Sequence, residues 1–127
     1  MRSEIYTGTI LFIEDEEVLR QLVQDELENY GYTVMIAGDG EEAVQIYSER
    51  YEKIDIVISD LGLPTLDGLA AFKKMKEINP NVKTIVVSGF MNSKEKEVLL
   101  NAGIKECFSK PYRVREILQT IHALVNA

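Results

Sequence analysis

The stretch of residues 54–68 reads IDIVISDLGLPTLDG and contains the clearest structural signal in the sequence. Its first part, Ile54–Ser59, is a short run rich in β-branched residues and predicts a strand that ends at Asp60. Apolar residues on consecutive positions are typical of a parallel strand buried on both faces. Asp67 and Gly68 have the residue types of a turn and a helix N-cap, so a strand, a loop and a helix follow one another here.

The same alternation continues in both directions along the chain. Four further short apolar runs are predicted strands, and each is followed by a stretch with apolar residues at helical spacing. Gly31 and Gly103 each stand where such a helix would end. The four further predicted strands are Thr9–Ile13, Thr33–Ile36, Lys83–Val87 and Ile104–Phe108. Regular alternation over 127 residues predicts a single α/β domain, with a doubly wound parallel sheet that carries helices on both faces.

The composition excludes several classes of protein. With 46% hydrophobic and 28% charged residues the chain is ordinary for a globular domain. No apolar run approaches the roughly 18 residues of a membrane span. The net charge of −7 would repel nucleic-acid phosphates and anionic lipid, so we expect no direct contact with nucleic acid or membrane. A single cysteine, Cys107, and the lack of an apolar signal-peptide core in residues 1–9 indicate a cytoplasmic location.

Residues that carry chemistry stand where the predicted strands end. Glu14 and Asp15 follow the first strand, Asp60 the third, Ser88 the fourth and Lys110 the fifth. Because ligands bind outside the carboxyl ends of such strands, we expect these side chains to converge at one edge. Three carboxylates brought together repel each other, and at least one pKa would be raised unless a cation compensated them. Oxygen ligands with no His or Cys nearby in the sequence favour Mg²⁺.

This set of groups also fits the transfer of a phosphoryl group. Asp60 is the natural nucleophile, because a carboxylate that attacks phosphorus gives an acyl phosphate. Lys110 would offset the charge on the equatorial oxygens, and the Ser88 hydroxyl would donate a hydrogen bond to one of them. The sequence therefore predicts a site that receives phosphate covalently.

Four motifs, in this order and spacing, resemble the receiver domain of two-component response regulators over essentially the whole chain. The motifs are Glu14–Asp15, residues 60–68, Ser88–Gly89 and Lys110–Pro111. The resemblance implies a flavodoxin-like fold of five parallel strands in the order 2-1-3-4-5. It also implies that the peptide bond before Pro111 is cis.

The resemblance further implies roles for individual residues. Asp60 would be the phosphoacceptor, Ser88 the switch hydroxyl and Lys110 the cation that senses the phosphate. A Mg²⁺ ion would be held by Glu14, Asp15, Asp60 and the backbone carbonyl of Gly62. The phosphoryl donor would be a phosphohistidine on a histidine kinase or on a histidine phosphotransfer protein.

The sequences of residues 30–34 and 87–90 resemble those of receivers at the C-terminal end of hybrid sensor histidine kinases. On that resemblance we expect the natural protein to extend upstream, with residues 1–8 as a disordered lead. One departure concerns the position three residues before the lysine, where receivers usually carry Tyr or Phe and this chain has Cys107. The next residue, Phe108, should face the opposite side of the strand and belong to the core.

Competing functions are weaker. A flavin- or dinucleotide-binding domain needs a Gly- or Ser/Thr-rich loop after the first strand, but this chain has the acidic run Glu14–Glu17. A haloacid dehalogenase-type phosphatase would need a second acid at Gly62. His122 lies beside the apolar stripe of the last helix and is not expected to donate phosphate. We expect a signalling domain whose only reactions are its own phosphorylation and slow dephosphorylation. The remaining alternative is an interaction module that docks without being phosphorylated.

Overall fold

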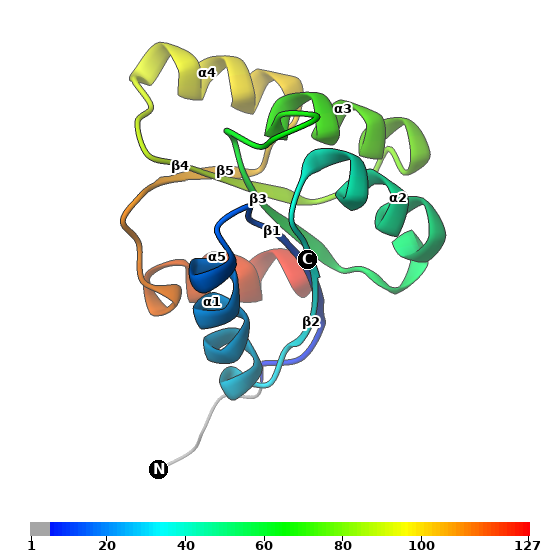
Figure 1. Ribbon diagram of the computed structural model, residues 1–127, viewed down its shortest axis with the longest axis vertical. Coiled ribbons are helices and arrows are strands. Elements are labelled where there is room, and N and C mark those ends of the chain that lie inside the picture. The colour runs from blue at the N-terminus through cyan, green and yellow to red at the C-terminus, as the bar shows by residue number, and fades with distance from the viewer. Residues whose placement is uncertain (1–5) are drawn as a thin grey trace.

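The computed structural model describes residues 6–127, which form a five-stranded parallel sheet covered by helices on both faces (Figure 1). The strands are β1 (Thr9–Ile13), β2 (Thr33–Ala37), β3 (Ile56–Asp60), β4 (Thr84–Ser88) and β5 (Glu106–Ser109). Their order in the sheet is β2-β1-β3-β4-β5, and every neighbouring pair is parallel. The predicted α/β fold and strand order are confirmed.

The helices form two layers. They are α1 (Glu17–Tyr30), α2 (Gly40–Arg50), α3 (Gly68–Ile78), α4 (Ser93–Ala102) and α5 (Val114–Val125), with a short 3-10 turn, η1 (Tyr51–Lys53), after α2. Helices α1 and α5 lie on one side of the sheet, and α2, α3 and α4 lie on the other (Figure 1). Each connection therefore crosses over a face of the sheet and returns the chain to the same edge.

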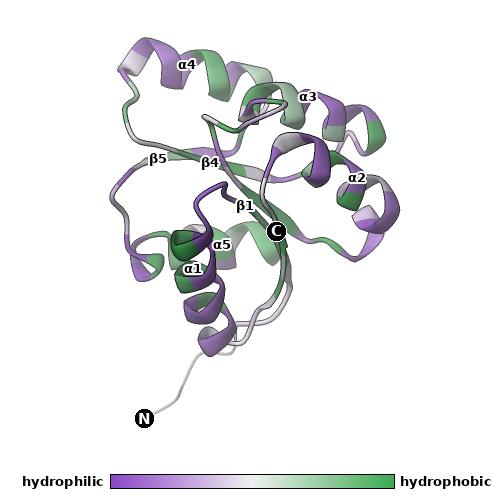
Figure 2. Cartoon of the chain, viewed as in Figure 1, coloured by the Kyte–Doolittle hydropathy of each residue, from purple (hydrophilic) through white to green (hydrophobic). Residues whose placement is uncertain are grey.

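The alternation of side chains along each strand builds one core on each face. In β1, Ile10 and Phe12 pack toward α1 and α5, while Leu11 and Ile13 pack toward the helices of the other face. All four are fully buried, as expected of a central strand covered on both sides. Figure 2 shows the apolar strands inside and the hydrophilic outer surfaces of the helices.

The predicted helix punctuation is confirmed. Gly31 and Gly103 follow α1 and α4 with φ values of 118° and 115°, a conformation that an L side chain rarely adopts. Asp67 caps α3, since its side chain accepts a hydrogen bond of 2.8 Å from the backbone N–H of Ala70.

Two predicted strands begin two residues too early, and the predicted strand Lys83–Val87 begins one residue too early. Ile54 belongs to the turn after η1, where its N–H donates to the Tyr51 carbonyl at 3.3 Å. Ile104 completes the end of α4, since its N–H donates to the Leu99 carbonyl at 3.1 Å. Both isoleucines are buried, so they satisfy an apolar pattern without pairing in the sheet. The pattern reports burial, and the ladder begins two residues later.

The structure describes only the last three residues, 6–8, of the predicted lead. Residues 1–5 of the predicted disordered lead lie outside the described residues. Residues 6–8 are described, and the Tyr6 ring packs edge-on against His122 and Tyr30, with centroids 5.3 and 5.8 Å away. The Gly8 carbonyl also accepts the N–H of Thr33 at 2.9 Å, which ties this segment to β2. Within residues 6–127, no helix has the length and apolar character needed to cross a membrane.

Candidate functional site

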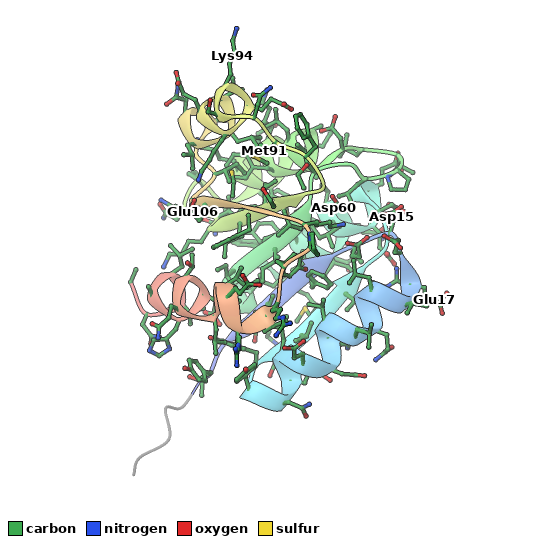
Figure 3. The ribbon with its side chains drawn as sticks, turned by 90° about the vertical axis from the view of Figure 1, so that its left-hand side faces the viewer. Asp15, Glu17, Asp60, Met91, Lys94 and Glu106 are labelled. Atoms are coloured by element: carbon green, nitrogen blue, oxygen red, sulfur yellow. The ribbon has the colours of Figure 1, made fainter. Side chains whose placement is uncertain are left out.

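The carboxyl ends of β1, β3, β4 and β5 meet at one edge of the sheet, as expected of parallel strands. At this edge the chain delivers an acidic pair, a third carboxylate, a hydroxyl and an ammonium group. Figure 3 shows Asp15 and Asp60 near one another, with Glu17 at the start of α1 directed away from them. The three acidic residues that come together are Glu14, Asp15 and Asp60.

Lys110 is the hub of the site. Its Nζ lies 2.8 Å from Asp60 Oδ2 and 2.9 Å from Glu14 Oε1. Burial by itself would lower the pKa of Lys110, but the hydrogen bonds to Asp60 and Glu14 outweigh it and hold the pKa above its ordinary value. The ammonium group is therefore charged at neutral pH and positioned on the carboxylate of Asp60.

Glu14 is fully buried although its side chain ends in an ionisable carboxyl group. Burial raises the pKa of its carboxyl; the hydrogen bond from Lys110 opposes this shift, and the nearby charge of Asp60 adds to it. The other carboxylate oxygen accepts the backbone N–H of Glu16 at 3.1 Å. The sequence reasoning missed Arg20, whose guanidinium donates to the Glu14 carbonyl at 2.9 Å. Arg20 lies within α1, and no local sequence pattern marks it.

The three carboxylates form a group that suits a divalent cation. One oxygen from each of Glu14, Asp15 and Asp60 lies within 4.8 Å of the others, and Asp15 is exposed to solvent. Lys110 supplies one positive charge against three acids, so further positive charge would be favourable. All the donors are hard oxygens, which Mg²⁺ prefers.

The loop after β3 leaves room beside Asp60. The N–H of Gly62 donates to Asp60 Oδ1 at 3.2 Å, which orients the carboxylate. Apart from Gly62 itself and its two chain neighbours, no described residue has a heavy atom within 4 Å of the position that a Cβ on Gly62 would occupy. The loop is held against α2, where a Cβ on Gly40 would lie 1.9 Å from the Leu66 carbonyl oxygen. Only glycine fits at position 40, because any side chain there would push the loop after β3 away from α2.

Ser88 stands at the end of β4 and is 8% exposed. Its hydroxyl donates to the backbone carbonyl of Phe90 at 3.0 Å, within its own loop. Its backbone carbonyl accepts the N–H of Lys110 at 2.7 Å, which joins the fourth and fifth strand ends. The peptide bond between Lys110 and Pro111 is cis, as predicted.

Tyr112 is a second residue that the sequence reasoning missed. Its ring packs with the α1 and α5 core, and its buried hydroxyl has no hydrogen-bond partner among residues 6–127. Burial, together with the charge of Glu14, raises the pKa of Tyr112 to about 12. Its place directly after Pro111 is the only sequence signal that it borders the site.

The expected packing around the departure at Cys107 is confirmed. Cys107 is buried in the core cluster that also contains Leu99, and burial raises the pKa of its thiol. Phe108 packs against the opposite cluster with α5. The two side chains therefore face opposite sides of β5.

Comparison with known proteins agrees with this geometry. Residues 10–122 match the response regulator receiver domain family. The chain belongs to this family. It is 32% identical over 112 residues to the sensor histidine kinase RcsC of Escherichia coli K12. The matched residues are 88% of this chain but only 12% of RcsC.

Two solved receiver structures are similar in fold. A response regulator receiver domain protein from Clostridium thermocellum has a TM-score of 0.89 at 28% identity, with 94% of each chain covered. The receiver domain of the sensor histidine kinase PA1611 from Pseudomonas aeruginosa has a TM-score of 0.84 at 25% identity, covering 96% of this chain and 100% of that one. That structure has a magnesium ion coordinated in its active site cleft. This chain is thus a receiver domain of two-component signal transduction.

Proposed function

We propose that this receiver domain accepts a phosphoryl group on Asp60 from a phosphohistidine and passes the signal on through its loops and surface. The observation that carries the proposal is the placement of Lys110 Nζ, 2.8 Å from Asp60 Oδ2 and 2.9 Å from Glu14 Oε1. An ammonium group held there lies next to the oxygen that would carry the phosphoryl group. The matched receiver family supports the same role.

In the proposed reaction an oxygen of Asp60 attacks phosphorus in line with the leaving imidazole. The P–N bond to histidine breaks, a P–O bond to Asp60 forms, and the electron pair leaves on the imidazole nitrogen. Lys110 offsets the charge that develops on the equatorial oxygens. In the product, the Ser88 hydroxyl donates a hydrogen bond to one of those oxygens. Water later attacks phosphorus, releases phosphate and restores the carboxylate.

The acidic residues fit a Mg²⁺ ion. Glu14, Asp15 and Asp60 would hold it, with the backbone carbonyl of Gly62 as a further ligand. The bound ion would neutralise charge on the carboxylates and on the incoming phosphoryl group. The fit rests on three carboxylates that each place an oxygen within 4.8 Å of the others, two of which pair with Lys110, and the magnesium in the PA1611 receiver supports it.

The donor would be a histidine kinase or a histidine phosphotransfer protein in the cytoplasm, and α1 offers a surface for it. Val18 and Leu22 are 75% and 61% exposed and lie one turn apart on α1. Beside them, Leu19, Pro111 and Tyr112 line a hollow of about 290 Å³ together with the active-site lysine. An apolar patch next to the phosphoacceptor suits docking of the helix that carries the phosphohistidine.

The proposal is tested by weighing the intact chain after incubation with acetyl phosphate, with and without Mg²⁺. We expect one added phosphoryl group only with Mg²⁺, and none in Asp60→Asn. A phosphoryl mass on Asp60→Asn would contradict the assignment. A wild-type chain that gains no mass from acetyl phosphate or from any histidine kinase would instead favour the interaction module that works by docking alone.

The docking surface has its own test. Val18→Asp and Leu22→Asp should slow phosphorylation by a histidine kinase that phosphorylates the wild-type chain. Neither change should slow phosphorylation by acetyl phosphate, which needs no docking surface. Leu100→Asp, an exposed apolar position on α4, serves as the matched control. Equal slowing with both donors would contradict a role in docking.

A further inference from the structure

An apolar groove lies between the loop after β3 and helix α4. It has a volume of about 600 Å³ and is lined by Leu61, Gly62, Leu69, Val98 and Leu99, with polar residues at its rim. The groove is beside the candidate phosphoacceptor, because Leu61 and Gly62 directly follow Asp60. Helix α4 covers it thinly, since Leu99 is its only buried residue and Val98 is 54% exposed.

Phe90 is close in sequence to the rim of this groove, and its side chain is in solvent. It is 77% exposed, the most exposed of the large apolar side chains in the described part of the chain. It precedes by two residues Asn92, which belongs to the rim of the groove. Burial of an aromatic ring is favourable, so the nearby groove is a better environment for this ring than water.

A hydrogen bond within the loop ties Phe90 to the end of β4. The Ser88 hydroxyl donates to the Phe90 carbonyl at 3.0 Å. Gly89 lies between them, and apart from these three residues no described residue has a heavy atom within 4 Å of the position that a Cβ on Gly89 would occupy. A serine hydroxyl has one proton to donate, so it holds either this carbonyl or another acceptor, but not both.

We propose that Phe90 is a lid that closes on the groove when the Ser88 hydroxyl transfers its hydrogen bond to a phosphoryl oxygen on Asp60. The freed loop turns about Gly89, and the ring packs against Leu69 and Val98. In the closed position it lies beside Gly62, over the approach to Asp60. The inference rests on the proposed function, because the phosphoryl group is what takes the hydroxyl away.

The lid also gives this chain an aromatic switch in a new place. The thiol of Cys107, at the position where receivers usually carry an aromatic residue, is buried and has little volume to move. Phe90 supplies a solvent-exposed ring two residues after Ser88. Phosphorylation would then bias two positions of one ring, as a two-state switch requires.

The lid is tested by tryptophan fluorescence. The chain has no Trp, so Phe90→Trp adds a single reporter at an exposed position. On phosphorylation with acetyl phosphate and Mg²⁺ we expect a blue shift of the emission and several-fold weaker quenching by acrylamide. In that background Val98→Glu should abolish both changes, because it puts a charge into the groove. Leu100→Glu, on the same helix but outside the groove, should leave them unchanged.

Two further measurements make the outcome decisive. Ser88→Ala in the Phe90→Trp background removes the latch, so the unphosphorylated protein should already show part of the blue shift. In the wild-type chain, NMR should show contacts between the Phe90 ring and the methyl groups of Leu69 and Val98 only after phosphorylation.

The phosphoryl mass of each sample separates the two possible failures. A chain that gains the mass while the reporter emission and the ring contacts stay unchanged overturns the lid and leaves the role of Asp60 intact. A chain that gains no mass overturns the proposed function, and the lid with it. An unshifted Ser88→Ala variant overturns the latch that defines the lid.

Discussion

Lys110 Nζ lies 2.8 Å from Asp60 Oδ2, which joins two residues 50 positions apart in the chain. The same nitrogen holds Glu14 Oε1 at 2.9 Å, so one ammonium group from the end of β5 ties down carboxylates from β3 and β1. Asp15 adds a third negative charge to the group. The resting site is therefore held together by one cation and remains short of positive charge, which is the electrostatic state that favours Mg²⁺ and an incoming phosphoryl group.

Lys110→Met should destabilise the fold, because it leaves Glu14 and Asp60 facing each other without a cation. The lysine side chain is 20% exposed, so we expect a loss of about 1–3 kcal/mol in the free energy of unfolding, below the value for a fully buried pair. Addition of Mg²⁺ should recover part of it. Urea unfolding measures both effects, and Lys53→Met, at an exposed lysine in η1, is the control. Equal losses in the two variants would contradict the role of Lys110 as the hub.

Asp60→Asn should keep the fold and lose the response to Mg²⁺. Removal of one charge relieves repulsion with Glu14 but also weakens the bond from Lys110, so we expect a net change within about 1 kcal/mol. The wild-type chain should gain stability as Mg²⁺ is added, because an ion that binds only the folded state stabilises it. Thermal unfolding with increasing Mg²⁺ compares the two. Asp67→Asn keeps the cap of α3, and its Mg²⁺ response should match that of the wild type.

The fold and most of the site could be predicted from the sequence because both depend on strand ends. A buried parallel strand has a strong local signal, and Asp60, Ser88 and Lys110 stand at ends of such strands. Residues whose role depends on contacts across the fold gave no such signal. Arg20 reaches back to the Glu14 carbonyl from within α1, and only the packing of α1 against the sheet brings them together.

Strand boundaries show the same limit. Ile54 and Ile104 are as apolar and as buried as strand residues, yet their N–H groups bond to η1 and α4. The groove beside Phe90 could not be predicted either, since it is formed by the loop after β3 and by α4, which lie far apart in sequence. A hydrophobic pattern reports burial, while pairing and hollow space depend on tertiary placement.

Tyr112→Phe should change how stability depends on pH. The pKa of Tyr112 is raised from 10.0 to about 12 in the folded chain, so its contribution is fully present below about pH 10 and is lost as the pH rises toward 12. Above about pH 10 the wild type should therefore lose stability more steeply than Tyr112→Phe. At neutral pH the variant should be equal or up to about 1 kcal/mol more stable, since the buried hydroxyl is unpaired. Urea unfolding from about pH 8 to about pH 11 tests both statements, and parallel pH profiles would contradict the first.

Phe90→Glu should shorten the life of the phosphorylated state. Gly62 and Phe90 stand two residues after Asp60 and Ser88, and we expect them to flank the approach of water to phosphorus. An apolar ring offers no hydrogen bond to orient that water, whereas a carboxylate does, so we expect phosphoryl loss to speed up by roughly threefold or more. The decay of the phosphoryl mass after removal of the donor gives the rate. Leu100→Glu adds the same charge away from the site, and a half-life that is the same in both variants would contradict the idea.

Activation should move the loops and leave Cys107 almost unchanged. Ser88 and Cys107 lie on neighbouring strands, and movement of the hydroxyl toward a phosphoryl oxygen frees space behind it. A tyrosine in that space would have to relocate a large ring with a polar tip, but a buried thiol has little volume to move and no strong partner to exchange. We therefore expect beryllofluoride with Mg²⁺, which mimics the phosphoryl group, to shift the amide signals of residues 89–93 and of the Lys110 loop strongly. The signal of Cys107 should shift only slightly. Amide spectra with and without the mimic decide this, because a Cys107 signal that moves as far as that of Ser88 would make the thiol side chain part of the switch.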